Sequence, residues 1–559
     1  MHLARPAALA ATVLASLAIA SAPALGSGSV AVELAPGVAP SALGVPAEPA
    51  LSSDAVAALS ARAGRLGNEV PEIGRWYTVP VHPDRAGALA DRLDAKPGVS
   101  ADVAYEPAAP PAACRAGRYP YISAAGAVPD LSGFQDYRAG LSIPAGADGA
   151  GVRLTDMEYD WNPAHVDLAG RSLGAAAVPP GGYPSDWKAD HHGTAVLTLL
   201  AGSADGQGVT GLVAAADVRA VSPYSPERGG FVFADTIARA AADLRPGDVL
   251  LLEQQVDVDP GPATVLAPIE ADAASRDAIR LAVASGITVV EPAGNGDVDL
   301  DSLGIPWLTS AAGALHSGAI VVAAGRVADR GRASLSNYGS RVDVQGWGEQ
   351  VVAGGYGTGM VGKGDPNRLF TACFDGTSSA SATVAGAITA LQGLSLTQRG
   401  GMLDPAQVRE AIVATGLPQA AGEPRIGPRP QVAAAAEYAL RLPAHATASV
   451  RPAVDERNPA TESSGAVLAS RPVVTRVRAS FRRGVLVVTL RDLAPRAVVR
   501  VAGKRVRAPA GRAVVRGLRA GRLKLTVTAP RRADVGYRAA AYTLTVKAAG
   551  AVRVARASR

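Results

Sequence analysis

Short apolar runs alternate with segments of helical period between residues 151 and 440, and this alternation limits the folds that the chain can adopt. The predicted strands are Gly151–Thr155, Val218–Ser222, Val249–Leu252, Ile287–Val290 and Ala319–Ala323. The predicted helices are Thr194–Ala201, Phe233–Leu244, Asp272–Ser285, Ala380–Leu391, Pro405–Ala414 and Gln431–Leu440. Strands that are buried on both faces read as unbroken apolar runs. The pattern therefore predicts a mostly parallel sheet covered by helices, with functional side chains at the carboxyl ends of its strands.

The sequence before this region divides into an export signal and a small module. Residues 1–24 combine a weakly basic start, an apolar run and the small-residue pattern Ala22-Pro23-Ala24, which predicts a secretory signal peptide. An N-terminal membrane anchor is the alternative, but the apolar run is short for it. Residues 31–60 are rich in Ala, Pro, Gly and Ser, so we expect a linker or a weakly ordered region there. Residues 74–106 predict a strand, a helix and a strand, which form a small α+β module.

The C-terminal part of the chain differs from the rest in charge. Residues 471–559 contain 23 basic and 2 acidic residues, although the whole chain has only 55 basic and 49 acidic residues. Short alternating runs such as Val485–Leu490 and Leu523–Val527 predict an all-β domain. Its basic surface could bind an anionic surface or a cell-wall polymer, or it could be solvated without a partner. Few aromatic residues are interleaved with its arginines, so we expect no specific nucleic-acid binding.

The only two cysteines of the chain are Cys114 and Cys373. In an exported protein such a pair is expected to form a disulfide, although two buried thiols would also fit. A bridge would join the segment before the predicted sheet to the strand that precedes Ser378.

Four reactive side chains occur where predicted strands end or helices begin: Asp156, His192, Asn295 and Ser378. An acyl-transfer site needs a hydroxyl, an imidazole that takes its proton, a carboxylate that orients the imidazole, and a donor for the oxyanion. Ser378 alone could equally be an ordinary helix N-cap. The presence of the other three side chains favours a nucleophile. We interpret Glu158 and Asp160, which follow Asp156, as structural residues or residues of the rim.

The segments around these residues resemble the motifs of the subtilisin-like serine peptidases (subtilases, peptidase family S8). They read LTDMEYDWN, HHGTAVLTLLAG, EPAGNGD and FDGTSSASATVAGA, and they follow one another in the family's order. The resemblance implies a three-layer α/β sandwich and hydrolysis of peptide bonds without a required cofactor. It also implies that Ser378 is the nucleophile, His192 the general base and acid, Asp156 the orienting carboxylate and Asn295 the oxyanion donor. Ser379 is a poorer candidate, because the family's nucleophile directly follows Gly-Thr.

Some positions depart from the family's pattern. Ala382 stands where a proline is usual, and Ala195 where a second histidine is usual. The family's primary specificity pocket is lined by a short strand that contains glycine. The candidate pocket residues here are Glu253, Gln254, Gln255 and Gly294. A charged Glu253 in this pocket would favour basic residues before the scissile bond, whereas a solvent-facing or structurally paired Glu253 would not.

Three acidic residues, Asp297, Asp299 and Asp301, alternate after Asn295 and are candidates for a structural calcium site. A solvated acidic loop is the alternative interpretation. The sequence contains neither a phosphate-binding loop nor the ligand spacing of a zinc site.

The sequence therefore predicts a secreted subtilisin-like serine endopeptidase that acts on proteins or peptides and has no transmembrane segment after signal removal. The predicted parts are a signal peptide (1–24), a propeptide-like region with linker (25–118), the catalytic domain (119–445), a linker (446–472) and a basic β-rich domain (473–559). The resemblance makes the small module an inhibitory propeptide. The alternatives are a catalytically silent binding module with the same fold and a surface adhesin that acts through its C-terminal domain.

Overall fold

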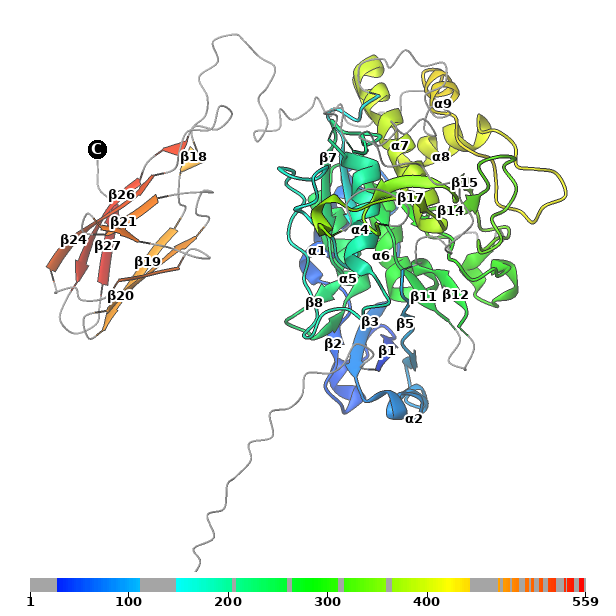
Figure 1. Ribbon diagram of the computed structural model, residues 1–559. Coiled ribbons are helices and arrows are strands. Elements are labelled where there is room, and N and C mark those ends of the chain that lie inside the picture. Colours follow the sequence, from blue (N-terminus) through cyan, green and yellow to red (C-terminus); the bar gives the residue numbers. More distant parts are fainter. Residues whose placement is uncertain are drawn as a thin grey trace, which may run out of the picture. The chain divides into compact units, whose positions relative to one another are not determined.

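The computed structural model describes residues 28–110, 147–203, 208–258, 264–309, 316–357 and 364–442, together with strand segments between residues 471 and 556. The chain divides into two compact units, residues 1–448 and 449–559 (Figure 1). The predicted signal peptide lies outside the described residues, as does almost all of the predicted linker 446–472. Within the described part of the chain, no helix is both long enough and apolar enough to cross a membrane.

A six-stranded parallel sheet forms the centre of the first unit. Its strand order is β15-β14-β13-β10-β6-β7, and each neighbouring pair is parallel. The strands are β6 (Arg153–Met157), β7 (Asp217–Val221), β10 (Val249–Leu252), β13 (Thr288–Pro292), β14 (Ile320–Gly325) and β15 (Val344–Trp347). The five predicted strands are all present, whereas β15 was not predicted. The observed sheet confirms the predicted α/β fold class.

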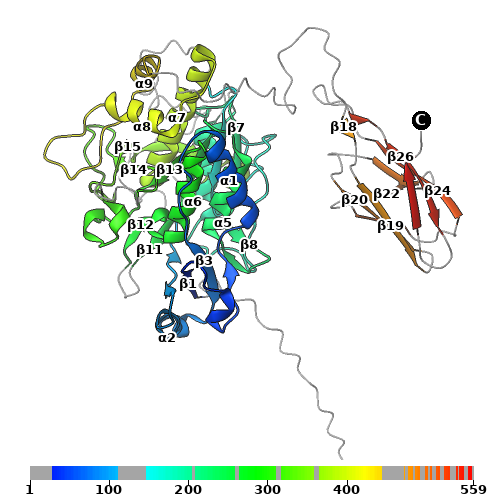
Figure 2. The same cartoon turned by 180° about the vertical axis from the view of Figure 1, so that it is seen from behind.

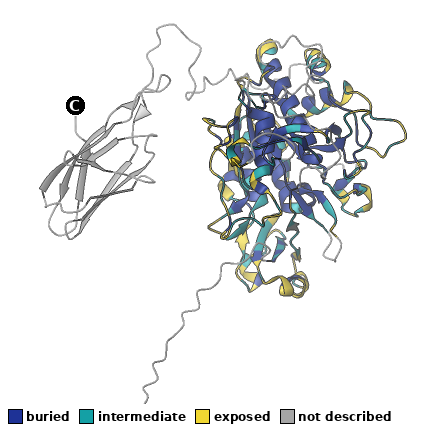
Figure 3. Cartoon of the chain, in the orientation of Figure 1, coloured by how far each residue is buried: buried dark blue, intermediate teal, exposed yellow. Residues whose placement is uncertain are grey.

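Helices cover both faces of this sheet, and a separate apolar core lies on each side. The helices are α4 (Ala189–Ala201), α5 (Phe233–Asp243), α6 (Ala273–Ala284), α7 (Thr377–Arg399), α8 (Pro405–Ala414) and α9 (Val432–Ala439). Leu251 packs in the core with α4 and α7, whereas Leu250 and Leu252 pack in the core with α5 and α6. Burial on both faces explains the unbroken apolar runs, and Figure 3 shows the sheet and the facing sides of its helices as buried.

The first residues of the unit form a second, smaller layer. A four-stranded sheet of order β2-β3-β1-β4 packs against α2. The elements are β1 (Ser29–Leu34), β2 (Glu48–Pro49), α1 (Ser53–Arg65), β3 (Arg75–Pro80), α2 (Pro83–Asp94) and β4 (Val99–Val103). The predicted linker over residues 31–60 is therefore wrong, because most of β1 and the start of α1 lie within it. Ser52 caps α1 by accepting a hydrogen bond from the Ala55 N–H.

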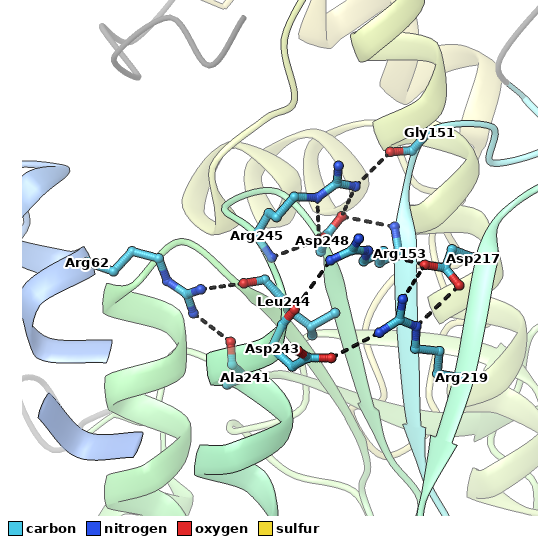
Figure 4. Close-up of polar contacts among 10 residues, drawn as sticks. All are labelled: Arg62, Gly151, Arg153, Asp217, Arg219, Ala241, Asp243, Leu244, Arg245 and Asp248. Atoms are coloured by element: carbon cyan, nitrogen blue, oxygen red, sulfur yellow. Dashed lines mark hydrogen bonds and ion pairs between the residues drawn. The ribbon is translucent and has the colours of Figure 1, made fainter. Parts of the chain in front are cut away.

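Helix α1 lies against α5 and α6 of the large sheet (Figure 2). Its Arg62 reaches the carboxyl end of α5 and donates hydrogen bonds to the carbonyl oxygens of Leu244 and Ala241 (Figure 4). A further bond joins Arg62 to Ser285 at the end of α6, with 3.0 Å between Nη2 and Oγ. A cation at the carboxyl end of a helix is favoured by the unpaired carbonyl groups and by the helix dipole. Arg62 therefore links α1 to the ends of both α5 and α6, and the Ser52 N–H at the start of α1 donates a further bond to Asp235 of α5 at 2.7 Å.

Shorter elements complete the first unit. The strands are β5 (Glu106–Pro107), β8 (Tyr224–Ser225), β9 (Gly230–Phe231), β11 (Gln255–Asp257), β12 (Leu266–Pro268), β16 (Val351–Gly354) and β17 (Phe370–Phe374). The 3₁₀ turns are Pro40–Leu43, Ile269–Ala271, Leu300–Ser302, Pro306–Leu308 and Pro366–Arg368. Strand β11 pairs antiparallel with β12 on one side and with β5 on the other.

The described segments of the second unit are all strands. They form sheets of order β19-β20-β23, β22-β21-β24-β26-β27 and β18-β25. The bounds are β18 (Arg471–Pro472), β19 (Arg476–Arg482), β20 (Val485–Arg491), β21 (Val498–Val501), β22 (Lys504–Val506), β23 (Arg512–Val515), β24 (Gly521–Thr528), β25 (Tyr537–Arg538), β26 (Ala540–Val546) and β27 (Val552–Arg556). The predicted runs Val485–Leu490 and Leu523–Val527 lie within β20 and β24.

Candidate active site

Adjacent strands β6 and β10 bring three carboxyl groups to one end of the sheet. Leu251 pairs with Asp156, and the Glu253 N–H continues the register by donating to the Met157 carbonyl at 3.3 Å. Glu253 therefore stands next to Glu158. Because side chains alternate along a strand, Asp156 and Glu158 point to the same side of the sheet. All three carboxyl groups are buried, with at most 3% of each residue exposed.

His192, on the first turns of α4, is bonded to one of these carboxyl groups. Its Nδ1 lies 2.9 Å from Oε1 and 3.1 Å from Oε2 of Glu158, and both side chains are buried. Burial lowers the pKa of His192 to about 3 and raises the pKa of Glu158. The resting pair is therefore held by a hydrogen bond and not by a full ion pair. The edge of the Phe374 ring packs against the imidazole, with 5.4 Å between ring centroids.

The structure corrects the predicted contact partner of His192. Glu158, which we had interpreted as structural, occupies the position expected for Asp156. Neither carboxyl oxygen of Asp156 has a hydrogen-bond partner among the described residues. Burial, together with the charge of Glu158, raises the pKa of Asp156. Asp156 lies within β6, one residue before its end, whereas Glu158 lies just beyond the strand and has the longer side chain.

Ser378 occupies the first turn of α7, whose helical residues begin at Thr377. The preceding Gly376 has φ 102°, a conformation that residues with a side chain rarely adopt, so glycine is needed to turn the chain into the helix. Ser378 is 1% exposed, and His192 Nε2 has no hydrogen-bond partner in the described part of the chain. Ser379 points elsewhere, because its Oγ lies 2.9 Å from the Trp347 carbonyl oxygen.

The amide of Asn295 is held by the start of α7 and by β11. Its Oδ1 accepts hydrogen bonds from the Thr377 N–H at 2.9 Å and from the Thr377 hydroxyl at 3.0 Å. Its Nδ2 donates to Gln255 Oε1 at 3.3 Å, and the same oxygen accepts from the Asn295 N–H at 3.0 Å. Asn295 is thus brought to the helix that carries Ser378, as predicted from the sequence order, with its Nδ2 engaged by Gln255.

The four candidate pocket residues are all buried and make different contacts. Glu253 is buried, and its Oε1 accepts a hydrogen bond from, or donates one to, the Ser381 hydroxyl at 2.8 Å, which fits the structurally paired alternative and not a charged residue in an open pocket. Gln254 is also buried and donates from Nε2 to the Met157 carbonyl at 2.7 Å. Gly294 has φ 99°, and a side chain there would meet Asn337. Of this set, Gln255 contacts both Asn295 and the N-terminal segment.

The N-terminal segment runs along the strand that holds Gln255. Pro107 pairs with Val256, and the Ala108 N–H donates to the Gln255 carbonyl at 3.2 Å. Gln255 Nε2 donates in turn to the Ala109 carbonyl at 3.0 Å. The Tyr159 hydroxyl donates to the Ala108 carbonyl at 3.3 Å. Residues 106–109 therefore occupy an extended site beside Asn295, with backbone bonds that any polypeptide could make.

The predicted calcium ligands make separate contacts. Asp297 pairs with Arg332 at 2.5 Å, and Asp299 accepts a hydrogen bond from the Asp301 N–H at 3.1 Å. Asp301 accepts from the Ser340 N–H at 2.8 Å. Among the described residues, these three carboxylates do not come close enough to one another to form a ligand group, and calcium binding stays a prediction.

One group among the described residues, Glu158, His192 and Glu253, brings its ligand-type atoms within 4.8 Å of one another. Nδ1 of His192 already bonds both oxygens of Glu158. We therefore treat the three residues as an acid–base cluster and not as metal ligands.

One of the two cysteines of the predicted disulfide, Cys373, lies in the described part of the chain. Cys373 is buried in β17 with 4% of the residue exposed. Cys373 is disulfide-bonded, and its only possible partner within the chain, Cys114, lies outside the described residues.

Comparison with known proteins adds to this geometry. Residues 160–427 match the model of the subtilase family, peptidase family S8. This part of the chain belongs to the subtilase family. The predicted family is thereby confirmed, and with it a serine-type peptidase, which is a hydrolase. The subtilase match begins just after Glu158, and it includes His192, Asn295 and Ser378.

Solved structures with similarity to this chain include the self-cleaved protease domain of PatA, with 23% identity, 52% of this chain and 96% of that chain covered, and a TM-score of 0.38. A protease from Pseudoalteromonas arctica matches with 21% identity, 56% and 98% coverage and a TM-score of 0.41. A cold-adapted subtilisin-like serine proteinase matches with 21% identity, 50% and 88% coverage and a TM-score of 0.35. No curated protein matches the chain.

Proposed function

We propose that this chain is a secreted serine endopeptidase in which Ser378, His192 and Glu158 form the catalytic triad. The observation that carries the proposal is the buried hydrogen bond between His192 Nδ1 and Glu158. A bond at Nδ1 fixes the imidazole tautomer and leaves Nε2 able to accept a proton. The lowered pKa of His192 keeps the imidazole neutral at physiological pH, as a general base requires.

In the proposed reaction, Ser378 Oγ attacks the carbonyl carbon of the scissile peptide and its proton moves to His192 Nε2. Glu158 stabilises the imidazolium that forms. The C–N bond then breaks as Nε2 gives the proton to the leaving amine, which leaves an acyl group on Ser378. A water molecule repeats the attack, with His192 as base and then as acid, and releases the carboxylic acid product and free Ser378.

The oxyanion of each tetrahedral intermediate would form at the start of α7. The unpaired N–H groups of this helix start and the positive end of its dipole favour negative charge. Asn295 Nδ2 would donate a further hydrogen bond there, after leaving Gln255. This step needs only a change of partner for one amide, because Thr377 continues to hold Asn295 Oδ1.

Substrates would bind as extended polypeptides along β11, where residues 106–109 now lie. The proposed role of the N-terminal module is therefore that of a propeptide that blocks the cleft until it is cleaved and released. The segment also engages Gln255, which holds the oxyanion donor. The blocked chain would thus be inactive for two reasons, an occupied cleft and an engaged Asn295.

Active-site labelling tests the proposed function. The mature exported protein is treated with a fluorophosphonate probe, digested, and mapped by tandem mass spectrometry, with casein hydrolysis measured in parallel. We expect one modified residue, Ser378, and loss of hydrolysis in proportion to labelling. An unlabelled and inactive mature protein, or a label on another serine, would contradict the proposal. N-terminal sequencing of the same material tests export, since the signal peptide 1–24 should be absent.

Replacement of Arg62 by alanine is expected to speed release of the N-terminal module about tenfold or more, because its hydrogen bonds are partly buried and hydrogen bonds to a charged group contribute about 1.5–3 kcal/mol. Arg62 is the residue of α1 that bonds the ends of α5 and α6. The measurement is the time course of casein hydrolysis after export of the full precursor. Arg65→Ala is the matched control, since Arg65 is exposed on the same helix. Equal time courses for the two variants would contradict this docking role.

The basic C-terminal domain is proposed to hold the enzyme on anionic surfaces. Deleting residues 443–559 should abolish retention on a polyanionic resin at low salt and leave casein hydrolysis unchanged. Retention by the full chain should weaken as salt rises, because salt screens interactions between exposed charges. Salt-independent retention would count against an electrostatic contact.

A further inference from the structure

Glu253 is a buried acid that the proposed mechanism does not use. It stands beside Glu158 on the neighbouring strand and is 3% exposed. Its Oε1 contacts the Ser381 hydroxyl at 2.8 Å, one helical turn after Ser378 in α7. Glu253 therefore joins the helix that carries the nucleophile to the strand ends that carry the acids.

The contacts of Ser381 indicate which partner donates. Its single hydroxyl hydrogen has three acceptors in range: Glu253 Oε1, the Thr377 carbonyl at 2.9 Å and the Ser378 carbonyl at 3.0 Å. An ionised Glu253 accepts only, so it would take this hydrogen and leave both carbonyl contacts unmade. A neutral Glu253 can donate to Ser381 Oγ, and Ser381 can then donate to the helix backbone. The neutral acid satisfies more of these groups.

We propose that Glu253, as a neutral carboxylic acid that donates a hydrogen bond to Ser381, is a positioning residue that fixes the first turn of α7 and its Ser378 against Glu158 and His192. This inference rests on the proposed function, since it assigns a role within that catalytic site. Glu253 acts by holding the Ser381 and Ser378 hydroxyls at the start of α7, and it takes no part in the proton transfers.

The surroundings of Glu253 favour its neutral form. The titratable groups that face it are Asp156 and Glu158 from the end of β6, His192 from α4, and Tyr356 from the segment after β16. Burial raises the pKa of Glu253, as do the charges of Glu158 and Asp156, and the hydroxyls of Ser381 and Ser378 lower it by less. Oε2 has no hydrogen-bond partner among the described residues, which makes a charge on this group costly.

A pH dependence follows from this arrangement. Because the pKa of Glu253 is raised, the group is neutral at low pH and ionises as the pH rises through its folded-state value. Ionisation would break its donation to Ser381 and place a negative charge near Ser378, where the oxyanion must form. The kcat of the wild type should therefore fall on the alkaline side. A glutamine at this position donates at every pH and cannot ionise.

The test compares kcat and KM from acid to alkaline pH for mature wild type, Glu253→Gln, Glu253→Ala and Ser381→Ala. We expect Glu253→Gln to match the wild type below the alkaline fall and to lack that fall. Glu253→Ala should lower kcat about 100-fold with little change in KM, since small misplacements of reacting groups have effects of this size. The double variant Glu253→Ala with Ser381→Ala should lose no more of its kcat than Glu253→Ala alone, because the two substitutions remove the same contact. Glu291→Gln is the control: it replaces a buried acid of β13 whose pKa is also raised, and the alkaline fall should remain.

The outcomes separate this inference from the proposed function. An unchanged alkaline fall in Glu253→Gln, in an enzyme that hydrolyses casein and is labelled at Ser378, would overturn the role of Glu253 alone. If the losses in kcat of Glu253→Ala and Ser381→Ala multiplied in the double variant, that result would also overturn the role of Glu253. If Glu253→Ala fails to fold, Glu253→Gln still decides the question, because it retains the shape and the donor. A wild type that is neither labelled nor active would overturn the proposed function and this inference with it.

Discussion

Replacement of Ser378 by alanine is expected to lower kcat for a peptide substrate by about 10⁶-fold, which is the effect of removing the nucleophile from a serine triad. The physical reason is that Ser378, at the start of α7, is the proposed nucleophile, so its removal leaves no hydroxyl in the triad to form the acyl bond. The small rate that remains would come from oxyanion stabilisation and substrate binding. The measurement is single-turnover and steady-state hydrolysis of a chromogenic peptide by the mature enzyme, with fluorophosphonate labelling of the same preparation.

Ser379→Ala is the matched control for this variant. Ser379 is the next residue, it is fully buried, and its hydroxyl lies within hydrogen-bond distance of the carbonyl oxygens of Trp347 and Gly376. Its loss should cost about 1 kcal/mol of unfolding free energy and leave labelling intact. If Ser379→Ala lost the label while Ser378→Ala kept it, the assignment of the nucleophile would be reversed.

The parallel sheet could be predicted from the sequence because burial on both faces leaves an unbroken apolar signal. Strand β10 shows this, since Val249 to Leu252 are all fully buried and its predicted bounds are the observed ones. The N-terminal strand β1 was missed for the opposite reason. Only alternate residues of Ser29–Leu34 are buried, and the surrounding Ala, Pro and Gly residues concealed that alternation. For β1, the amino-acid composition was therefore a poorer guide to secondary structure than the alternation of buried and less buried residues along the strand.

The site was predicted less completely than the fold. Local pattern placed His192, Asn295 and Ser378 at strand ends and helix starts, and the structure brings the elements that carry them together. It could not decide between Asp156 and Glu158, because a period of two puts both side chains on one side of the sheet. Nor could it place Glu253 beside Glu158, because that contact depends on the register of two strands that lie far apart in sequence.

Glu158→Gln is expected to lower kcat by about 10⁴-fold, because an amide in place of the carboxylate favours the wrong imidazole tautomer and cannot stabilise the imidazolium. The variant keeps the size and shape of the side chain that bonds His192 Nδ1. Asp156→Asn is the matched control and should keep kcat close to that of the wild type, since Asp156 has no hydrogen bond to His192. Steady-state kinetics at neutral pH would distinguish the two. The opposite result, a large loss in Asp156→Asn alone, would return the orienting role to Asp156.

The Asp156→Asn variant should also differ from the wild type in how its free energy of unfolding changes with pH. The pKa of Asp156 is raised in the folded state by burial and by Glu158, so the folded protein holds this proton at pH values where the unfolded chain, with a pKa of about 3.9, has lost it. The buried acid therefore costs stability as the pH rises above about 4, and it costs nothing at lower pH. Asp156→Asn should be more stable than the wild type at neutral pH, and this gain should disappear in acid, as measured by denaturant unfolding across pH. A constant difference at every pH would mean that Asp156 is ionised or paired in the folded enzyme. Asp156 would then again be a candidate for the carboxylate that orients His192.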